Sequence, residues 1–388
     1  MGLRVDIRKK TGDFQLQVCF ETDAGLHALL GASGSGKTMT LKCIAGIMTP
    51  DEGQISLDGR IFFDSGKKIN LPPQKRRTGY MFQDYALFPT MTVLQNVLAA
   101  MGRKKDTGRA ADYLRRFQVQ DLADRYPGKL SGGQKQRVAM ARIAAQEPAL
   151  ILLDEPFSAL DSHLKWVLQN EMKSLLDTAG VPAVLVTHSR DEVYRLCSSV
   201  CCLQDGISER TLPVRDFFKN PETVTGARLS GCKNVAPARV VDGHTVEVPL
   251  WGIRLHFGGG LPADAPARIR AVGIRAHMFH AERGEEDDNV LCVGRYEVLE
   301  DPFEWNVSFF AAGNACAPHL SEDLAERGDL WKVIAEEGSA ANSFAGEPSA
   351  APLLWRTARD PRRAFTVPEK LYLNSSDVML LRDSPASE

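Results

Sequence analysis

The stretch Gly31-Ala32-Ser33-Gly34-Ser35-Gly36-Lys37-Thr38 fits the pattern of a glycine, four residues, a second glycine, a lysine and a serine or threonine. The stretch Leu26-His27-Ala28-Leu29-Leu30 before it predicts a buried strand, and residues 39–45 after it predict the first turns of a helix. A glycine-rich turn between a strand and a helix lets backbone N–H groups point at phosphate oxygens. Lys37 is then suited to the β- and γ-phosphates and Thr38 to Mg²⁺. The stretch therefore predicts a nucleoside-triphosphate site.

The bulk composition is that of an ordinary globular protein with room for two or three domains: 388 residues, 44% hydrophobic, 25% charged and a net charge of −2. A chain without basic excess gives no reason to expect a nucleic-acid partner. No apolar run approaches the roughly 20 residues that span a bilayer, and the first residues lack the apolar run of a signal peptide. The eight cysteines include no Cys-x-x-Cys pair, so we expect reduced thiols, with Cys201 and Cys202 in a buried strand. These observations predict a soluble, cytosolic protein.

Two periodicities divide the first part of the chain between strands and helices. Residues 3–20 alternate and predict antiparallel strands, and Asp58-Gly59 predicts a hairpin within 53–63. Residues 93–125 have a helical pattern. From 26 to 205, strands alternate with helices, which predicts a parallel α/β sheet that binds ligands at the carboxyl ends of its strands.

Polar residues stand where three of these expected strands end: Gln83, the pair Asp154-Glu155, and His188. A further element, Leu130-Ser131-Gly132-Gly133-Gln134, precedes a helix expected over 135–146. Its serine and glycines lie where a helix N-cap and exposed N–H groups would be. The sequence therefore offers several groups suited to an anionic ligand.

The pattern changes near residue 228, where we place the boundary between two domains, 1–228 and 229–388. Beyond it, short β-like segments replace the helices, with a hairpin at Asp242-Gly243 and a long loop over 338–352. The acidic run 285–288 is expected to be a solvated loop. We expect the second domain to be mostly β and barrel-like.

Together and in this order, the motifs resemble those of the ATP-binding subunits of ABC transporters. The Leu-Ser-Gly-Gly-Gln element at 130–134 is particular to that superfamily among phosphate-loop ATPases. The resemblance covers residues 1–228. It implies an α/β fold: a phosphate-loop ABC ATPase domain with a parallel sheet core and an antiparallel β subdomain, followed by a mostly β, OB-like barrel that serves as a C-terminal regulatory domain.

The resemblance implies roles for individual residues in the binding and hydrolysis of ATP. The ATP-binding residues would be Gly31, Ala32, Ser33, Gly34, Ser35, Gly36, Lys37, Thr38, Thr40 and Phe14, with Phe14 the best candidate to stack on adenine and Phe20 an alternative. The Mg²⁺ ligands would be Thr38, Gln83 and Asp154. The catalytic residues would be Glu155 as base for the attacking water, His188 as a γ-phosphate contact, Gln83 and Lys37. Two subunits of this family face head to tail, so Ser131, Gly132, Gly133, Gln134 and Asp161 would act in trans on the ATP of the second subunit.

A single ATPase domain with a C-terminal β extension resembles an importer subunit. The resemblance implies a homodimer, an integral membrane permease that contacts Gln83–Pro89, and a periplasmic or lipid-anchored solute-binding protein that acts indirectly. It implies a cytoplasmic location on the inner face of the cell membrane. The segment 64–77 and Gly231-Cys232-Lys233-Asn234 resemble molybdate-importer ATPase subunits most. In some of these the C-terminal domain binds the oxyanion. Sulfate, Fe³⁺ and polyamine importers share the layout and stay open as alternatives.

Two other classes of protein fit the sequence less well. A soluble ABC ATPase acting on ribosomes or DNA would predict two cassettes in one chain, a long coiled-coil insertion or marked basicity, and the sequence has none of these. A non-catalytic ATP sensor is disfavoured because Glu155, His188 and Gln83 are all present. The sequence therefore predicts an ATPase that drives solute import.

Overall fold

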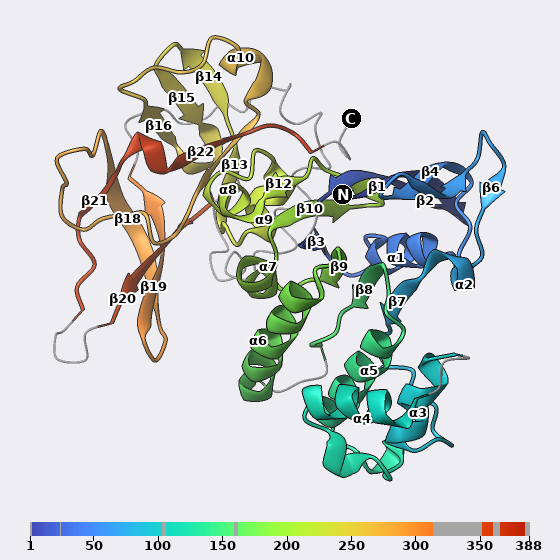
Figure 1. Cartoon of the computed structure of the whole chain (residues 1–388). Helices are drawn as coiled ribbons and strands as arrows, with labels where there is room; N and C mark the ends of the chain where they lie inside the picture. Colours follow the sequence, from blue (N-terminus) through green and yellow to red (C-terminus); the bar gives the residue numbers. More distant parts are fainter. Residues whose placement is uncertain are drawn as a thin grey trace. The chain divides into compact units, whose positions relative to one another are not determined.

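The computed structural model describes residues 2–23, 25–102, 106–158, 162–312, 351–359 and 365–384. The chain divides into two compact units, Met1–Lys219 and Asn220–Glu388 (Figure 1). Our expected boundary at 228/229 falls later than this division. The reason is helix α9 (Val224–Leu229), which contacts strands β13 and β17 of the second unit and shares an apolar cluster with them.

One twelve-stranded mixed sheet runs through the first unit. Its antiparallel part consists, in spatial order, of β6 (Ile69–Asn70), β5 (Arg60–Asp64), β4 (Glu52–Leu57), β1 (Leu3–Thr11) and β2 (Phe14–Thr22). Across β11 (Ile207–Ser208), the sheet continues as β10 (Ser199–Gln204), β3 (Leu26–Leu30), β9 (Ala183–Thr187), β8 (Leu150–Asp154) and β7 (Thr78–Met81), which are parallel to one another; β12 (Leu212–Pro213) pairs with β10. A parallel core with an antiparallel β subdomain is therefore confirmed.

The burial of each strand follows its residue pattern. Every residue of β8 and β9 is buried, as expected for apolar strands of a parallel sheet covered on both faces. Strands β1 and β2 alternate between buried and exposed residues over most of their length, because only one face is covered. The hairpin between β4 and β5 turns at Asp58 and Gly59, whose φ angles of 49° and 78° match a primed turn. Cys201 and Cys202 are buried and unbridged in β10, and burial raises the pKa of both thiols.

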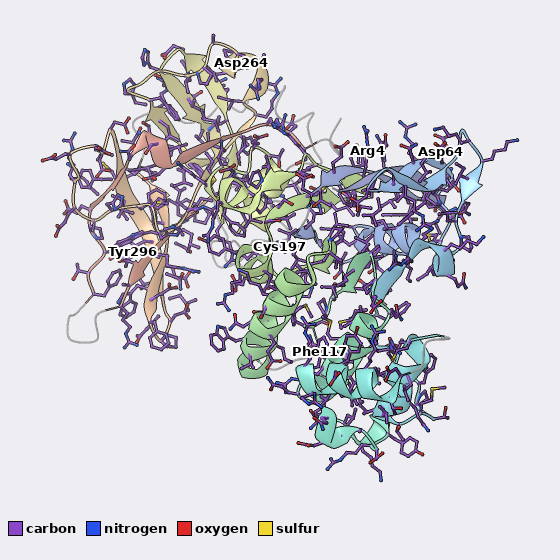
Figure 2. All side chains as sticks on the ribbon, viewed as in Figure 1. Arg4, Asp64, Phe117, Cys197, Asp264 and Tyr296 are labelled. Carbon is purple, nitrogen blue, oxygen red and sulfur yellow. The ribbon has the colours of Figure 1, made fainter. Side chains whose placement is uncertain are left out.

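The described helices of the first unit are α1 (Lys37–Ala45), α2 (Pro73–Arg76), α3 (Val93–Ala100), α4 (Thr107–Arg116), α5 (Gly132–Ala145), α6 (Ser162–Ala179), α7 (Arg190–Leu196) and α8 (Val214–Lys219). Of these, α3 to α7 lie along the chain between successive parallel strands. The helical stretch expected over 93–125 is interrupted and contains α3, α4 and a 3-10 turn. Phe117, at the end of α4, is buried in an apolar cluster that α3, α4 and α5 share (Figure 2). None of the helices in the described ranges is long and apolar enough to cross a membrane.

The second unit is mostly β, as expected. Its described strands form three sheets: β13 (Asn234–Pro237), β17 (Ala271–Ile274) and β22 (Val378–Leu381); β14 (Arg239–Asp242), β15 (Thr245–Val248) and β16 (Ile253–His256); and β20 (Leu353–Ala358), β19 (Glu304–Ala311), β18 (Asn289–Glu300) and β21 (Lys370–Leu373). One apolar cluster takes residues from all three. A short helix, α10 (Ala265–Arg268), precedes β17.

The sequence predicts two loops in the second unit, at 285–288 and 338–352. The acidic run is solvated only at Glu285 and Glu286. Asp287 is buried and accepts a hydrogen bond from the Gly284 N–H, and Asp288 accepts one from the Ser375 N–H, so the second half of the run holds loops together. The loop expected over 338–352 lies almost wholly outside the described residues.

Arg76 is the largest side chain that is fully buried in the described structure. Its guanidinium donates to the carbonyls of Cys43 and Ile44 at the end of α1, to the Leu71 carbonyl and to the Asn70 side chain, at 2.8–2.9 Å. A cation at a helix C-terminus also interacts favourably with the helix dipole. Burial lowers its pKa to about 10, which leaves it charged at neutral pH.

We predict that Arg76→Met destabilises the first unit by about 3 kcal/mol, because buried carbonyls lose their donors. This corresponds to a fall in Tm of roughly 8 °C in scanning calorimetry of the full chain. The control is Arg77→Met, because Arg77 is exposed and donates one hydrogen bond, to the Glu147 carbonyl. Equal Tm values for the two variants would contradict the assignment.

Candidate ATP-binding site

The strand order brings four sequence-predicted elements to one edge of the parallel sheet. Leu30 of β3 is in register with Thr187 of β9, Val186 with Asp154 of β8, and Leu153 with Met81 of β7. Since these strands are parallel, their carboxyl ends lie next to one another. The phosphate loop, His188, Asp154-Glu155 and Gln83 therefore follow neighbouring strands at the same edge.

The phosphate loop is held in shape by its own lysine. Lys37 is 4% exposed, and its amine donates to the carbonyls of Gly31 at 2.9 Å and Ala32 at 2.6 Å. Burial lowers the pKa of this amine, while the nearby carboxylates of Glu155 and Asp154 oppose the shift. Gly31 lies so close to β10 that a Cβ there would be 2.2 Å from the Leu203 carbonyl oxygen. The loop thus closes around the lysine that is expected to face phosphate.

The end of the loop is also tightly fixed. Gly36 is the N-cap of α1 with a φ of 99°, a conformation that glycine adopts without strain. Thr40 is fully buried, and its hydroxyl donates to the Gly36 carbonyl at 3.0 Å. Thr40 therefore supports the loop from the inside.

The side-chain oxygens of Thr38, in α1, and Asp154, at the end of β8, lie next to each other. The Thr38 hydroxyl donates to Oδ1 of Asp154 at 2.8 Å, and the Tyr80 hydroxyl donates to Oδ2 at 2.9 Å. Burial and the adjacent carboxylate raise the pKa of Tyr80, which keeps its hydroxyl a donor. Hydroxyl and carboxylate oxygens at this spacing are the ligands that Mg²⁺ prefers. The residues present therefore fit a magnesium ion bound beside a nucleotide.

Glu155 and His188 face each other beside this pair. Oε1 of Glu155 lies 3.5 Å from Nδ1 of His188, with the Glu155 side chain 20% exposed and the His188 side chain 59% exposed. Glu155 has a φ of 45° and its N–H donates to the Val186 carbonyl at 3.1 Å. Its direction is thus set by the backbone at the end of β8. A carboxylate and an imidazole therefore lie side by side, both partly exposed.

A buried carboxylate orders the residues on either side of His188. Glu192 is 3% exposed, and its carboxylate accepts a hydrogen bond from the Thr187 hydroxyl and pairs with Lys165 of α6. The Ser189 N–H donates to the Thr187 hydroxyl at 3.0 Å, and the Ser189 side chain caps α7. The position of His188 therefore depends on a group buried behind it.

Two further expected parts of the site are Gln83 and the stretch Leu130–Gln134, which we call the signature. Gln83 is exposed, two residues beyond the end of β7. Ser131 is the N-cap of α5: its hydroxyl accepts from the Gln134 N–H, and the Gln134 side chain accepts from the Ser131 N–H at 3.0 Å. This capping box confirms that a helix begins at the signature. Asp161, expected to act in trans, lies outside the described residues.

The two aromatic candidates for adenine stacking differ in position. Phe20 is 3% exposed and stacks on His27 within the apolar core, with 4.8 Å between ring centroids. Phe14 is half-buried beside the phosphate loop, where a Cβ on Gly36 would lie 3.2 Å from its Cζ. The geometry favours Phe14.

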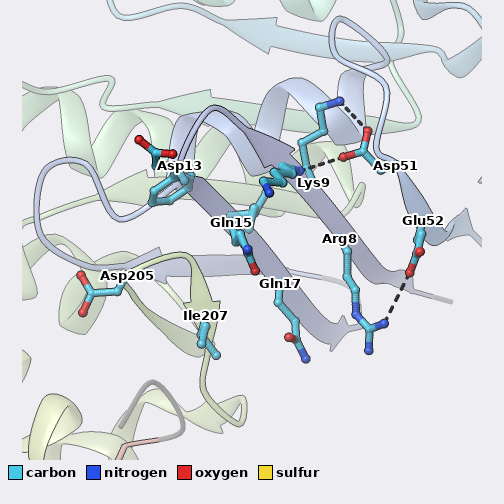
Figure 3. Close-up of a pocket in the computed structure, with 12 residues that line it drawn as sticks. Arg8, Lys9, Asp13, Gln15, Gln17, Asp51, Glu52, Asp205 and Ile207 are labelled. Carbon is cyan, nitrogen blue, oxygen red and sulfur yellow. Dashed lines mark hydrogen bonds and ion pairs between the residues drawn. The ribbon is translucent and has the colours of Figure 1, made fainter. Parts of the chain in front are cut away.

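Phe14 also lines a hollow of about 690 Å³, whose other walls include β1, β2 and the turn before β11 (Figure 3). Two ion pairs lie among its lining residues, Lys9 with Asp51 and Arg8 with Glu52 (Figure 3). An aromatic ring is thus accessible next to the loop.

Sequence reasoning missed three supporting residues: Tyr80, Glu192 and Lys165. Tyr80 belongs to an expected strand beside the one that ends at Asp154, so strand pairing was the only available signal. Glu192 is an acidic residue in the first turn of a helix, a position that the helix dipole favours. This pattern does not indicate that its side chain is buried.

The fold and these contacts define a phosphate-loop nucleotide-binding protein with a helix-capping signature motif. Residues 17–158 match the family model described as ABC transporter. The molybdenum import ATP-binding protein ModC of Paramagnetospirillum magneticum is 37% identical over 285 residues, which are 69% of this chain and 76% of that protein. The chain belongs to the ATP-binding family of ABC transporters.

Other relatives differ in the solute that they are named for. The Fe(3+) ions import ATP-binding protein FbpC of Haemophilus influenzae is 40% identical over 280 residues, with 70% of this chain and 77% of that protein covered. ModC of Rhizobium etli is 35% identical over 343 residues, with 85% of this chain and 95% of that protein covered. The first unit ends at Lys219, so a match that covers 85% of the chain must include much of the second unit.

Proposed function

We propose that this chain is the ATP-hydrolysing subunit of an importer for molybdate or a related oxyanion. The observation that supports molybdate as the solute is the similarity to a molybdenum import protein over 85% of the chain, which includes much of the second unit. The named FbpC relative supports Fe³⁺ as the alternative solute. ATP hydrolysis rests on the family and on the group of residues at the sheet edge.

Each of the residues at the carboxyl ends of the strands has its own role in hydrolysis. The loop N–H groups and Lys37 hold the phosphates, while Thr38 and Asp154, with Gln83, would hold Mg²⁺. When bound, that ion neutralises charge between the β- and γ-phosphates. Glu155 accepts the proton of the attacking water, and His188 donates a hydrogen bond to the γ-phosphate.

The site is completed by a second copy of the chain. Ser131, Gly132, Gly133, Gln134 and Asp161 of one copy act on the ATP held by the other copy. The start of α5 supports this role, because N–H groups at a helix N-terminus favour phosphate. Exposed residues at Gln83–Pro89, with Phe88 47% exposed, suit contact with a membrane permease. The protein would then lie on the inner face of the membrane, while a solute-binding protein acts indirectly through the permease.

We predict that Glu155→Gln preserves ATP binding, lowers kcat at least a hundredfold and traps an ATP-bound dimer, because the amide cannot accept the proton from water. Turnover is measured by phosphate release and the dimer by size-exclusion chromatography with light scattering. Glu147→Gln is the control, since Glu147 is exposed and pairs with Arg109. Normal turnover in Glu155→Gln would remove Glu155 from the mechanism.

We predict that Ser131→Asp separates the capping role of Ser131 from its role in trans. Aspartate caps helices as well as serine does, so the melting temperature should stay within about 2 °C. Its negative charge would face the partner's γ-phosphate, so the ATP-driven dimer and turnover should both be lost. Retained turnover in this variant would show that the signature does not meet phosphate.

The solute assignment predicts that molybdate binds the full chain. We expect millimolar molybdate to raise the melting transition of the second unit in scanning calorimetry, because a ligand that binds only the folded state stabilises it. Sodium chloride at equal ionic strength is the control, and sulfate and ferric citrate test the alternatives. A shift with ferric citrate alone would favour an iron importer.

A further inference from the structure

Arg142 lies in α5, in the same helix that begins at the signature motif. It is 8% exposed, and its guanidinium donates to two main-chain carbonyls, that of Ala86 at 2.6 Å and that of Tyr85 at 3.0 Å. Burial lowers its pKa, and the Asp84 carboxylate opposes the shift. A buried cation is thus bound by the backbone of another segment.

The two residues that Arg142 holds have strained backbones. Tyr85 has a φ of 63° and Ala86 a φ of 41°, a left-handed conformation that residues other than glycine, asparagine and aspartate rarely adopt. The Tyr85 N–H donates to the Phe82 carbonyl, which closes a turn around Gln83. Such a turn persists only where its surroundings fix it. Arg142 bonds to the carbonyl of each strained residue.

The segment beyond this turn is held as well. The guanidinium of Arg142 lies 5.6 Å from the ring centroid of Phe88. Asn96 of α3 is fully buried, accepts from the Phe88 N–H and donates to the carbonyls of Phe88, Met91 and Thr92. The stretch from Gln83 to Thr92 is therefore attached to both α3 and α5.

The opposite end of α5 carries Ser131. Arg142 lies eleven positions beyond Ser131 along this helix, about 16 Å at 1.5 Å per residue. A capping box fixes the first turn, and α5 contributes many buried residues to the apolar cluster. Displacement of the turn after Gln83 would therefore be passed to the signature.

We propose that Arg142 is a positioning residue that fastens the strained turn after Gln83 to the signature helix, so that the permease-facing stretch and Ser131 move as one body. The inference rests on the proposed function, in which these two elements meet the permease and the partner's ATP. A lysine provides one nitrogen and cannot bridge two carbonyls in the same way.

The test uses the full chain in the Glu155→Gln background. Arg142→Met should bind a fluorescent ATP analogue within about twofold of the parent, because the phosphate loop does not contact it. It should require at least tenfold more protein to form the ATP-driven dimer. Arg109→Met is the matched control: Arg109 pairs with Glu147 just beyond the end of α5, and its loss should leave the dimer unchanged.

A second substitution tests the strain directly. Because glycine adopts a φ of 41° freely, Ala86→Gly added to Arg142→Met should recover at least half of the lost dimerisation. Unchanged dimerisation in Arg142→Met, an equal loss of analogue binding, or no recovery with Ala86→Gly would each overturn the proposal. If Arg142→Met does not fold, Arg142→Lys is used in its place. We expect Arg142→Lys to weaken dimerisation as well, while analogue binding stays close to that of the parent. Failure of the Glu155→Gln parent to dimerise would overturn the proposed dimer and this inference with it.

Discussion

The hydrogen bond between the Thr38 hydroxyl and the Asp154 carboxylate joins the two halves of the nucleotide site. It requires β3 and β8 to be parallel and to end at the same edge, with only β9 between them. That register is set by three short strands whose every residue is buried. The site thus depends on the mainly apolar composition of these buried strands, because the polar residues of the site come where the strands end.

Much of the first unit could be predicted from the sequence. Apolar runs predicted the parallel strands, alternation of apolar and polar residues predicted β1 and β2, and the Asp58-Gly59 pair predicted a hairpin. These signals are local, so each could be interpreted from a few neighbouring residues. The catalytic candidates were found for the same reason, since they directly follow strands or begin a helix.

Three buried charged residues could not be predicted in this way. Arg76, Arg142 and Glu192 have charged side chains in helices, where charge normally indicates a solvated face. Arg76 and Arg142 are buried against carbonyls from segments distant in sequence, and Glu192 pairs with Lys165 of another helix; no local pattern reveals these contacts. Neither arginine has an acidic residue within four positions in the sequence that would signal an ion pair, and the partners of both are mainly backbone oxygens. The second unit was predicted only as a class, since short strands carry weak patterns.

The amine of Lys37 is already satisfied by the Gly31 and Ala32 carbonyls. In the proposed function, phosphate oxygens take the place of these carbonyls, and the loop already has its closed shape before a nucleotide binds. Little conformational entropy is lost when the loop is preformed, so more of the phosphate interaction appears as affinity. In the proposed function, the same carbonyls are available to the amine when phosphate leaves. A cassette built in this way is suited to repeated cycles of loading and release.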